Sequence, residues 1–230
     1  MSAIAVVVAR AGSSRVPRKA LRTFAGTTLV GWAVERLLDS EAFREVYVGS
    51  DGDEILAEAE RHGAIAIKRD DHHCDETRCS ANEMIGDMMD RLSDVSLSET
   101  VCWAHPTNPL VLPSTYARAV EVFERDETDA DSLVSVGPVQ RHAWFRGRPL
   151  NHDPRSPRHQ LASELEPLQF QNGAIFIQTR RAMAQNCYFY GSTPLLFEID
   201  STEGFDVDTE ADLRMAAFLL AEREAACHSR

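Results

Sequence analysis

The sequence lacks a long hydrophobic run, since no stretch approaches the roughly 20 apolar residues that a membrane-spanning helix needs. It also lacks the start of a secretory signal, because Met1-Ser2-Ala3 places no basic segment before the first apolar residues. We therefore expect no membrane partner and a cytoplasmic location.

Positive charge is scarce as well. The chain has 24 Lys and Arg against 36 Asp and Glu, a formal net charge of -12. Affinity for nucleic acid depends on neutralising phosphates with cations. The charge balance therefore argues against a nucleic-acid partner.

The sequence also has no pattern of cysteines that indicates disulfide pairs. The cysteines are odd in number and scattered, which is typical of free thiols in a reducing compartment; they are Cys74, Cys79, Cys102, Cys187 and Cys227. His72 and His73 lie beside two of them and raise the question of a zinc site. No C-x-x-C pair completes the usual ligand spacing, so the sequence disfavours zinc.

The feature that stands out is a basic loop after the first apolar run, Ile4 to Val8. Neither G-x-x-x-x-G-K-[ST] nor G-x-G-x-x-G is present there. Instead the segment from Ala9 to Lys19 combines small residues with cations, which suits a loop that wraps a polyphosphate. Its glycine, serines and cations are Gly12, Ser13, Ser14, Arg10, Arg15, Arg18 and Lys19. The alternative is a solvated basic turn.

Strand-like and helix-like segments alternate along most of the 230 residues. Strands are expected at residues 6–9, 45–49, 64–67, 100–104 and 132–136, and helices at 29–38, 54–62, 80–92 and 114–125. This alternation predicts one α/β domain with a doubly wound, mostly parallel sheet. Ligands of such sheets bind beyond the carboxyl ends of the strands, where the basic loop, Ser50-Asp51 and residues 105–109 fall.

The alternation fails over residues 139–169, which are rich in turn formers and cations and predict an inserted arm. Trp144 and Phe145 lie on this otherwise polar segment. Either they pack against a second subunit or they cover the parent core.

A second chemical centre lies at Asp206 and Asp208. Carboxylates at i and i+2 on an extended segment point to one side, so both can reach one Mg²⁺. Thr209 and Asp212 form a capping pattern for a following helix. The acids could instead simply favour that helix N-terminus. A polyphosphate loop together with a two-carboxylate metal site indicates phosphoryl or nucleotidyl transfer.

Five motifs occur in order: Ala9-Arg10-x-Gly12-Ser13-x-Arg15-x-Pro17-x-Lys19, Ser50-Asp51, Pro106-Thr107-x-Pro109-Leu110, Asn172-Gly173-Ala174-Ile175-Phe176-Ile177 and Phe205-Asp206-Val207-Asp208-Thr209. Their order resembles the acylneuraminate cytidylyltransferases, nearly end to end. The resemblance implies a Rossmann-like nucleotidyltransferase domain, a homodimer formed through the arm, and a sugar acid whose anomeric hydroxyl attacks the α-phosphate of CTP, releasing pyrophosphate.

The same resemblance implies roles for individual residues. Those at the triphosphate are Ala9, Arg10, Gly12, Ser13, Arg15 and Lys19, of which Arg10, Arg15 and Lys19 act catalytically together with Asp208. Those at the base are Arg69, Thr77 and Ser80, and those at the sugar are His105, Thr107, Asn108, Asn172, Gly173, Tyr188 and Phe189. Asp206 and Asp208 hold Mg²⁺. Arg158, in the arm, is expected to bind the sugar carboxylate, because guanidinium binds carboxylate bidentately.

The chain departs from the family pattern at four positions. Ser14 replaces a usual lysine and Ala20 a usual asparagine, while His105 replaces glutamine and Val111 replaces arginine. The acceptor is expected to be a nine-carbon 2-keto sugar acid, with the eight-carbon acid Kdo as the alternative. A transferase for another nucleotide, or a homologue that binds nucleotide without turnover, also remains open. His105 is either a general base or a hydrogen-bonding scaffold residue.

Overall fold

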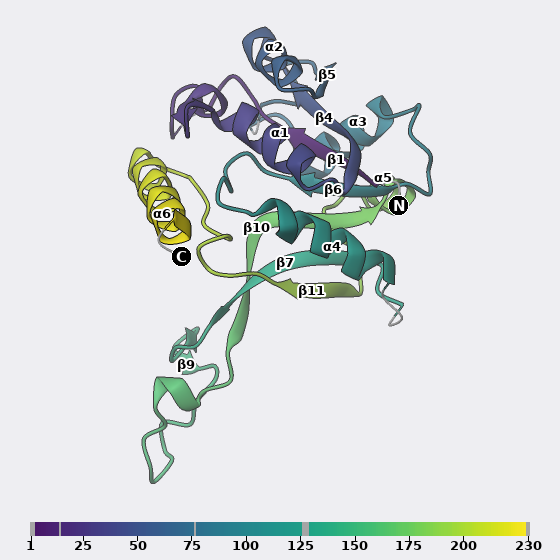
Figure 1. The fold of residues 1–230 in the computed structure, drawn as a ribbon. Helices are drawn as coiled ribbons and strands as arrows, with labels where there is room; N and C mark the ends of the chain where they lie inside the picture. Colours follow the sequence, from purple (N-terminus) through teal and green to yellow (C-terminus); the bar gives the residue numbers. More distant parts are fainter. Residues whose placement is uncertain (1–2, 14, 76, 126–128, 229–230) are drawn as a thin grey trace.

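A seven-stranded sheet lies between helices in the computed structural model, which describes residues 3–13, 15–75, 77–125 and 129–228 (Figure 1). The strand order is β11-β7-β10-β6-β1-β4-β5. These strands are β1 (Ala3–Val8), β4 (Phe43–Ser50), β5 (Ile65–Lys68), β6 (Thr100–Ala104), β7 (Ser132–Val139), β10 (Leu168–Thr179) and β11 (Pro194–Glu198).

Most neighbouring strands are parallel. The pairs β1–β4, β1–β6, β4–β5 and β11–β7 are parallel, whereas β10 runs antiparallel to both β6 and β7. The prediction of a doubly wound, mostly parallel α/β sheet is thereby confirmed.

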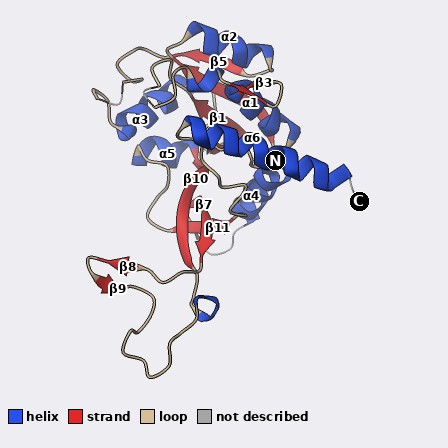
Figure 2. Cartoon of the chain, turned by 90° about the vertical axis from the view of Figure 1, so that its left-hand side faces the viewer, coloured by secondary structure: helices blue, strands red, loops and turns tan. Residues whose placement is uncertain are grey.

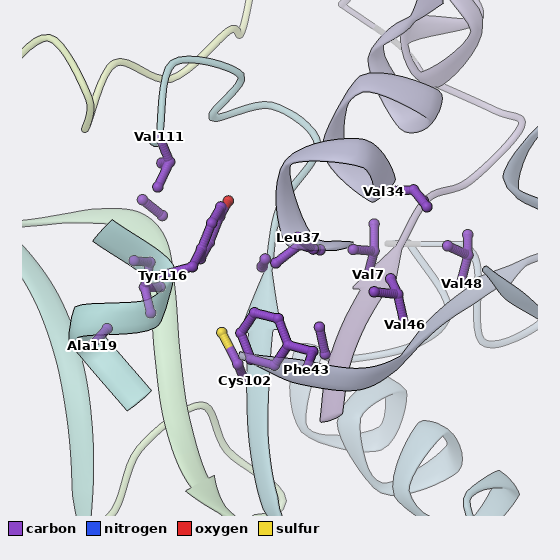
Figure 3. Packing of buried hydrophobic residues seen from close by; sticks show 14 of the residues in the cluster. Val7, Val34, Leu37, Phe43, Val46, Val48, Cys102, Val111, Tyr116 and Ala119 are labelled. Carbon is purple, nitrogen blue, oxygen red and sulfur yellow. The ribbon is translucent and has the colours of Figure 1, made fainter. Parts of the chain in front are cut away.

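Alternate residues of the central strand face opposite layers. Ala5 and Val7 pack on the side that holds α1 (Leu29–Asp39), α2 (Asp53–Arg61) and α4 (Pro113–Arg125). On this side Val7, Leu37, Phe43 and Tyr116 belong to one buried apolar cluster (Figure 3). Ile4 and Val6 face the layer of α3 (Ala81–Arg91) and α5 (Arg180–Asn186). Because β1 is buried on both faces, it reads as a continuous apolar run.

Local sequence signals set the starts of three helices. Thr28 caps α1 by accepting from the amide of Gly31 at 3.1 Å. Ser80 and Glu83 form a capping box at α3. Thr209 and Asp212 cap the N-terminus of α6 (Glu210–His228), where the Asp212 amide donates to Thr209 Oγ1 at 3.2 Å. The predicted caps at Thr28 and Thr209 are therefore confirmed, and each fixes where a loop of the site ends.

Helix α6 packs outside α1. Its residues Leu213, Ala216 and Leu220 form a buried cluster with Leu29 and Trp32. The short 3₁₀ turn η1 (Lys19–Leu21) and the hairpin of β2 (Thr23–Phe24) with β3 (Thr27–Thr28) link the basic loop to α1. The segment that carries Asp206 and Asp208 is thus held beside the basic loop.

An arm extends away from the sheet between β7 and β10 (Figures 1 and 2). It contains β8 (Trp144–Phe145), β9 (Arg148–Pro149) and the 3₁₀ turn η2 (Ala162–Glu164). Trp144 and Phe145 are each 61% exposed. These exposed rings do not cover the parent core, which excludes that one of the two alternatives.

The cysteines agree with the sequence expectations, whereas some elements of the fold do not. Cys74, Cys79, Cys102 and Cys187 are free thiols. Within the described residues, no helix is both long and apolar enough to cross a membrane. The sequence patterns predict neither the antiparallel orientation of β10 nor the elements α5 and β11.

Candidate active site

The basic loop leaves the carboxyl end of β1 and is anchored there by backbone and carboxylate contacts. The Ala9 amide donates to the carbonyl of Gly49 at 3.0 Å, and the Ala11 amide donates to Asp51 Oδ1 at 2.8 Å. The Ser50-Asp51 motif therefore positions this loop. A Cβ at Gly12 would meet no atom within 4 Å, so the glycine leaves open space beside the loop.

A cavity of about 170 Å³ lies under this loop, at the carboxyl ends of β1 and β6. Three of the four loop cations line it, namely Arg10, Arg15 and Lys19. The remaining wall residues are Val8, Ala9, Ser13, Ala20, Leu29, His105, Pro106 and Thr107. Concentrated positive charge in a concave site suits a polyphosphate.

The fourth cation, Arg18, faces another way. It pairs with Glu54 and lines a different hollow with Gly52 and Ile55. Its φ of 53° lies in the left-handed region, where the chain turns into η1. Of these two arginines, Arg15 therefore lines the first cavity and Arg18 lines the other hollow, while Ser14, which precedes Arg15, lies outside the described residues.

Lys19 and Arg15 join this cavity to the acid segment almost 190 residues away. Lys19 Nζ donates to the Val207 carbonyl at 2.9 Å and lies 3.5 Å from Asp208 Oδ1. Arg15 pairs with Asp208 Oδ2 at 2.6 Å. The Val207 amide in turn donates to the Thr107 carbonyl at 2.8 Å. Three segments therefore meet at Val207 and Asp208.

Asp206 lies near His105, a wall residue of this cavity, and its negative charge acts to raise the pKa of that ring. The donor set fits Mg²⁺, because carboxylate oxygens beside a phosphate-sized cavity are the ligands that this hard cation prefers. Asp206 and Asp208 are the residues that would hold it.

His105 lies in the wall of this cavity and contacts the segment around Gly173. Its Nδ1 lies 2.7 Å from the carbonyl oxygen of Gly173. Because a carbonyl only accepts, Nδ1 carries the proton and Nε2 keeps its lone pair. Burial lowers the pKa of His105, although the Gly173 carbonyl and the charge of Asp206 act in the opposite direction. The ring is therefore neutral near pH 7.

A second cavity of about 250 Å³ adjoins the first and shares Val8, Arg10 and His105 with it. Its other wall residues are Arg69, His73, Cys74, Cys79, Ser80, Ala81, Met84 and Trp103. This cavity is more apolar than the first, which suits a flat ring. Trp103 and Met84 were missed from the sequence, where they read as ordinary core residues. The buried Trp103 indole N–H has no hydrogen-bond partner among the described residues.

Arg69 is held rigidly at this second cavity and is only 1% exposed. Its Nε donates to Asp87 Oδ2 at 3.1 Å, and its Nη2 donates to the His73 carbonyl at 2.9 Å. Ser80, the cap of α3, also lines the cavity, but Thr77 is exposed and bonded to Asp75. Of the residues predicted at the base, the structure thus brings Arg69 and Ser80 together.

Several residues expected at the sugar make contacts that hold backbone segments in place. Asn108 Nδ2 donates to the Asn172 and Phe205 carbonyls at 3.3 and 3.4 Å. Gly204 faces Asn172 so closely that a Cβ there would lie 2.7 Å from Asn172 Nδ2. Gly173 has a φ of +75° and supplies the carbonyl that orients His105. These residues support the acid segment and the histidine.

The remaining predicted sugar residues lie outside the cavity walls. Phe189 packs on the rings of His105, Trp103 and Phe176, while Tyr188 offers its carbonyl to Gln178. Arg158 is paired with Glu164 at 2.5 Å in the arm. Within one chain the structure does not bring Arg158 to either cavity, because the arm points away from the sheet (Figure 2). Val111, where the family has arginine, is buried in the core.

Comparison with known proteins agrees with this geometry. A family model described as cytidylyltransferase matches residues 4–202. The chain belongs to the cytidylyltransferase family. It is thus a nucleotidyltransferase, and the resemblance drawn from the five motifs is confirmed.

Relatives of this cytidylyltransferase match it over nearly its whole length. A CMP-N,N'-diacetyllegionaminic acid synthase of Legionella pneumophila is 29% identical, over 96% of this chain and 97% of its own. A pseudaminic acid cytidylyltransferase of Campylobacter jejuni is 25% identical, over 95% of this chain and 96% of its own. N-acylneuraminate cytidylyltransferase A of Danio rerio is 27% identical over 92% of this chain but 49% of its own.

The fold is shared with a solved CMP:2-keto-3-deoxy-manno-octonic acid synthetase in complex with CTP, at a TM-score of 0.72 and 20% identity. The alignment covers 96% of this chain and 99% of the other.

Proposed function

We propose that this cytidylyltransferase joins CMP from CTP to the anomeric hydroxyl of a nonulosonic acid. The observation that carries the proposal is the pair of adjoining cavities, one lined by Arg10, Arg15 and Lys19 and the other by Arg69. The relatives named for legionaminic, pseudaminic and N-acylneuraminic acids support the class of acceptor.

In the proposed reaction, the triphosphate binds in the first cavity and the cytosine in the second. The sugar oxygen forms a bond to the α-phosphorus while the bond to the bridging oxygen of the β-phosphate breaks, and pyrophosphate leaves. Arg10, Arg15 and Lys19 stabilise the charge that grows on the phosphate oxygens. Mg²⁺, when bound by Asp206 and Asp208, would neutralise part of that charge.

The attacking hydroxyl must lose its proton. We propose His105 as the acceptor, because its ring is neutral, its Nε2 has a free lone pair, and it lines both cavities. If His105 is only a scaffold for Gly173, His105→Gln will leave the pH profile of kcat unchanged.

We further propose that the protein is a homodimer formed through the arm. Five large apolar side chains of the arm and its base are more than half exposed, namely Trp144, Phe145, Leu150, Leu161 and Phe170. Such a patch on a protruding segment is typical of a protein interface.

The test of the reaction is pyrophosphate release from CTP and Mg²⁺ with a panel of nonulosonic and octulosonic acids, beside ATP, GTP and UTP. Release that requires CTP and one nonulosonic acid is the expected result. Turnover with Kdo alone would transfer the proposal to the eight-carbon acceptor. CTP binding without turnover across the panel would instead identify a binding-only homologue.

A further inference from the structure

The loop between β5 and α3 carries a cluster of metal-ligating side chains that the proposed reaction does not use. One ligand atom from each of His72, His73 and Cys79 lies within 4.8 Å of the other two. The spacing of these residues in the sequence does not match a common zinc motif. Folding nevertheless brings them together, because the chain turns back between His73 and the cap of α3.

The three ligand atoms must move closer together to bind a single ion. Zinc binds histidine nitrogen at about 2.0–2.1 Å and cysteine sulfur at about 2.3 Å, which separates ligand atoms of a tetrahedral site by about 3.3–3.6 Å. Two imidazoles and a thiolate form a donor set that selects Zn²⁺ over Mg²⁺. The site would therefore be chemically distinct from the pair Asp206 and Asp208.

A carboxylate already orients one of the proposed ligands. His73 Nδ1 lies 2.9 Å from Asp70 Oδ1, and Asp70 is held by Arg91 at 3.1 Å. This contact places the proton on Nδ1 and leaves Nε2 with a lone pair. A histidine that donates to a carboxylate through its other nitrogen is the usual support of a metal ligand.

A competing group of Asp70, His73 and Asp87 also converges in the same loop. Its carboxylates, however, are already compensated by guanidinium groups. Asp87 accepts from Arg69 at 3.1 Å and from Arg91 at 2.8 Å. These acids are therefore better placed to support a ligand than to bind an ion directly.

We propose that His72, His73 and Cys79 bind one Zn²⁺ ion, with water in the fourth position. The ion binds the Cys79 thiolate, so one proton leaves the thiol for solvent on binding. It would fasten the loop that forms one wall of the second cavity, which His73 and Cys79 line.

The site can be tested by titrating chelator-treated protein with Co²⁺ in the absence of CTP and sugar, so that the result is independent of the proposed reaction. We expect one equivalent of Co²⁺ to bind with a thiolate-to-cobalt absorption band and the visible spectrum of a tetrahedral site. Zn²⁺ should displace it. Asp70→Ala should weaken Zn²⁺ binding by about 10–100-fold, the usual cost of removing such a support.

Two variants and a control decide which side chains bind. Cys79→Ser should abolish the thiolate band, and His72→Ala should weaken Zn²⁺ binding without a risk to folding, because His72 is exposed. Cys187→Ser, which removes a thiol outside the cluster, should change neither. Absence of a thiolate band, or Zn²⁺ affinity unchanged in His72→Ala, would overturn the proposal. Binding lost only in Asp87→Asn would overturn it as well, in favour of the carboxylate group.

Discussion

Replacing Lys19 by Met should damage both catalysis and folding. The Lys19 side chain is 14% exposed, and its ammonium donates to the Val207 carbonyl and faces Asp208. A hydrogen bond from a charged group contributes about 2 kcal/mol to stability. For a chain of this size that loss lowers Tm by about 4–8 °C. Removing one charged donor from the reacting phosphate should lower kcat by about 100- to 1000-fold.

The matched control is Arg18→Met, which removes a cation from the same loop. Arg18 is 65% exposed and pairs with Glu54, itself 71% exposed, so the pair should contribute only about 0–1 kcal/mol. Pyrophosphate release and differential scanning calorimetry on both variants separate the two effects. Equal losses in the two variants, or near-normal kcat and Tm in Lys19→Met, would refute the assignment of Lys19 as the link between the phosphate cavity and the acid segment.

Three further outcomes are expected. Asp208→Asn should lower Mg²⁺-dependent kcat at least about 100-fold, since the metal supplies several kcal/mol and each 1.36 kcal/mol is tenfold; retained turnover in steady-state assays would remove this acid from the reaction. Burial lowers the pKa of His105, so the unfolded chain binds the extra proton first, and stability is lost as pH falls below about 6.5. As the pH is lowered from 6.5 to 5, the Tm of His105→Gln should therefore fall less than the Tm of the parent protein. An equal fall of Tm in the two proteins would contradict this. The double variant Trp144→Ala, Phe145→Ala should have the mass of a monomer by light scattering and should still unfold cooperatively with its own Tm. A mass equal to that of the parent protein would place any interface elsewhere.

Much of the architecture follows from local signals. The apolar run of β1 and the caps at Thr28 and Thr209 are read directly from short patterns, because each depends on residues a few positions apart. The orientation of β10 could not be read in this way. A buried strand shows the same apolar run whether its neighbours are parallel or antiparallel.

The sequence offers candidate residues for the site, but it does not show which of them line a cavity. The basic loop offers four cations, yet only a backbone turn with positive φ at Arg18 sends one of them toward Glu54 while the others face the cavity. In the same way, the motif does not show that the Asn108 amide donates to two backbone carbonyls from distant segments. Such choices depend on tertiary contacts between segments far apart in the chain.

The bond from Lys19 to Val207 also bears on how the protein is made. The loop that contains Lys19 leaves the ribosome early, whereas residues 206–208 follow every strand of the sheet. Non-local contacts of this kind form late, after the loop-closure entropy has been overcome. A nascent chain can therefore build most of the sheet while the basic loop still lacks its contact with the acid segment, because that contact forms only after synthesis has passed Val207.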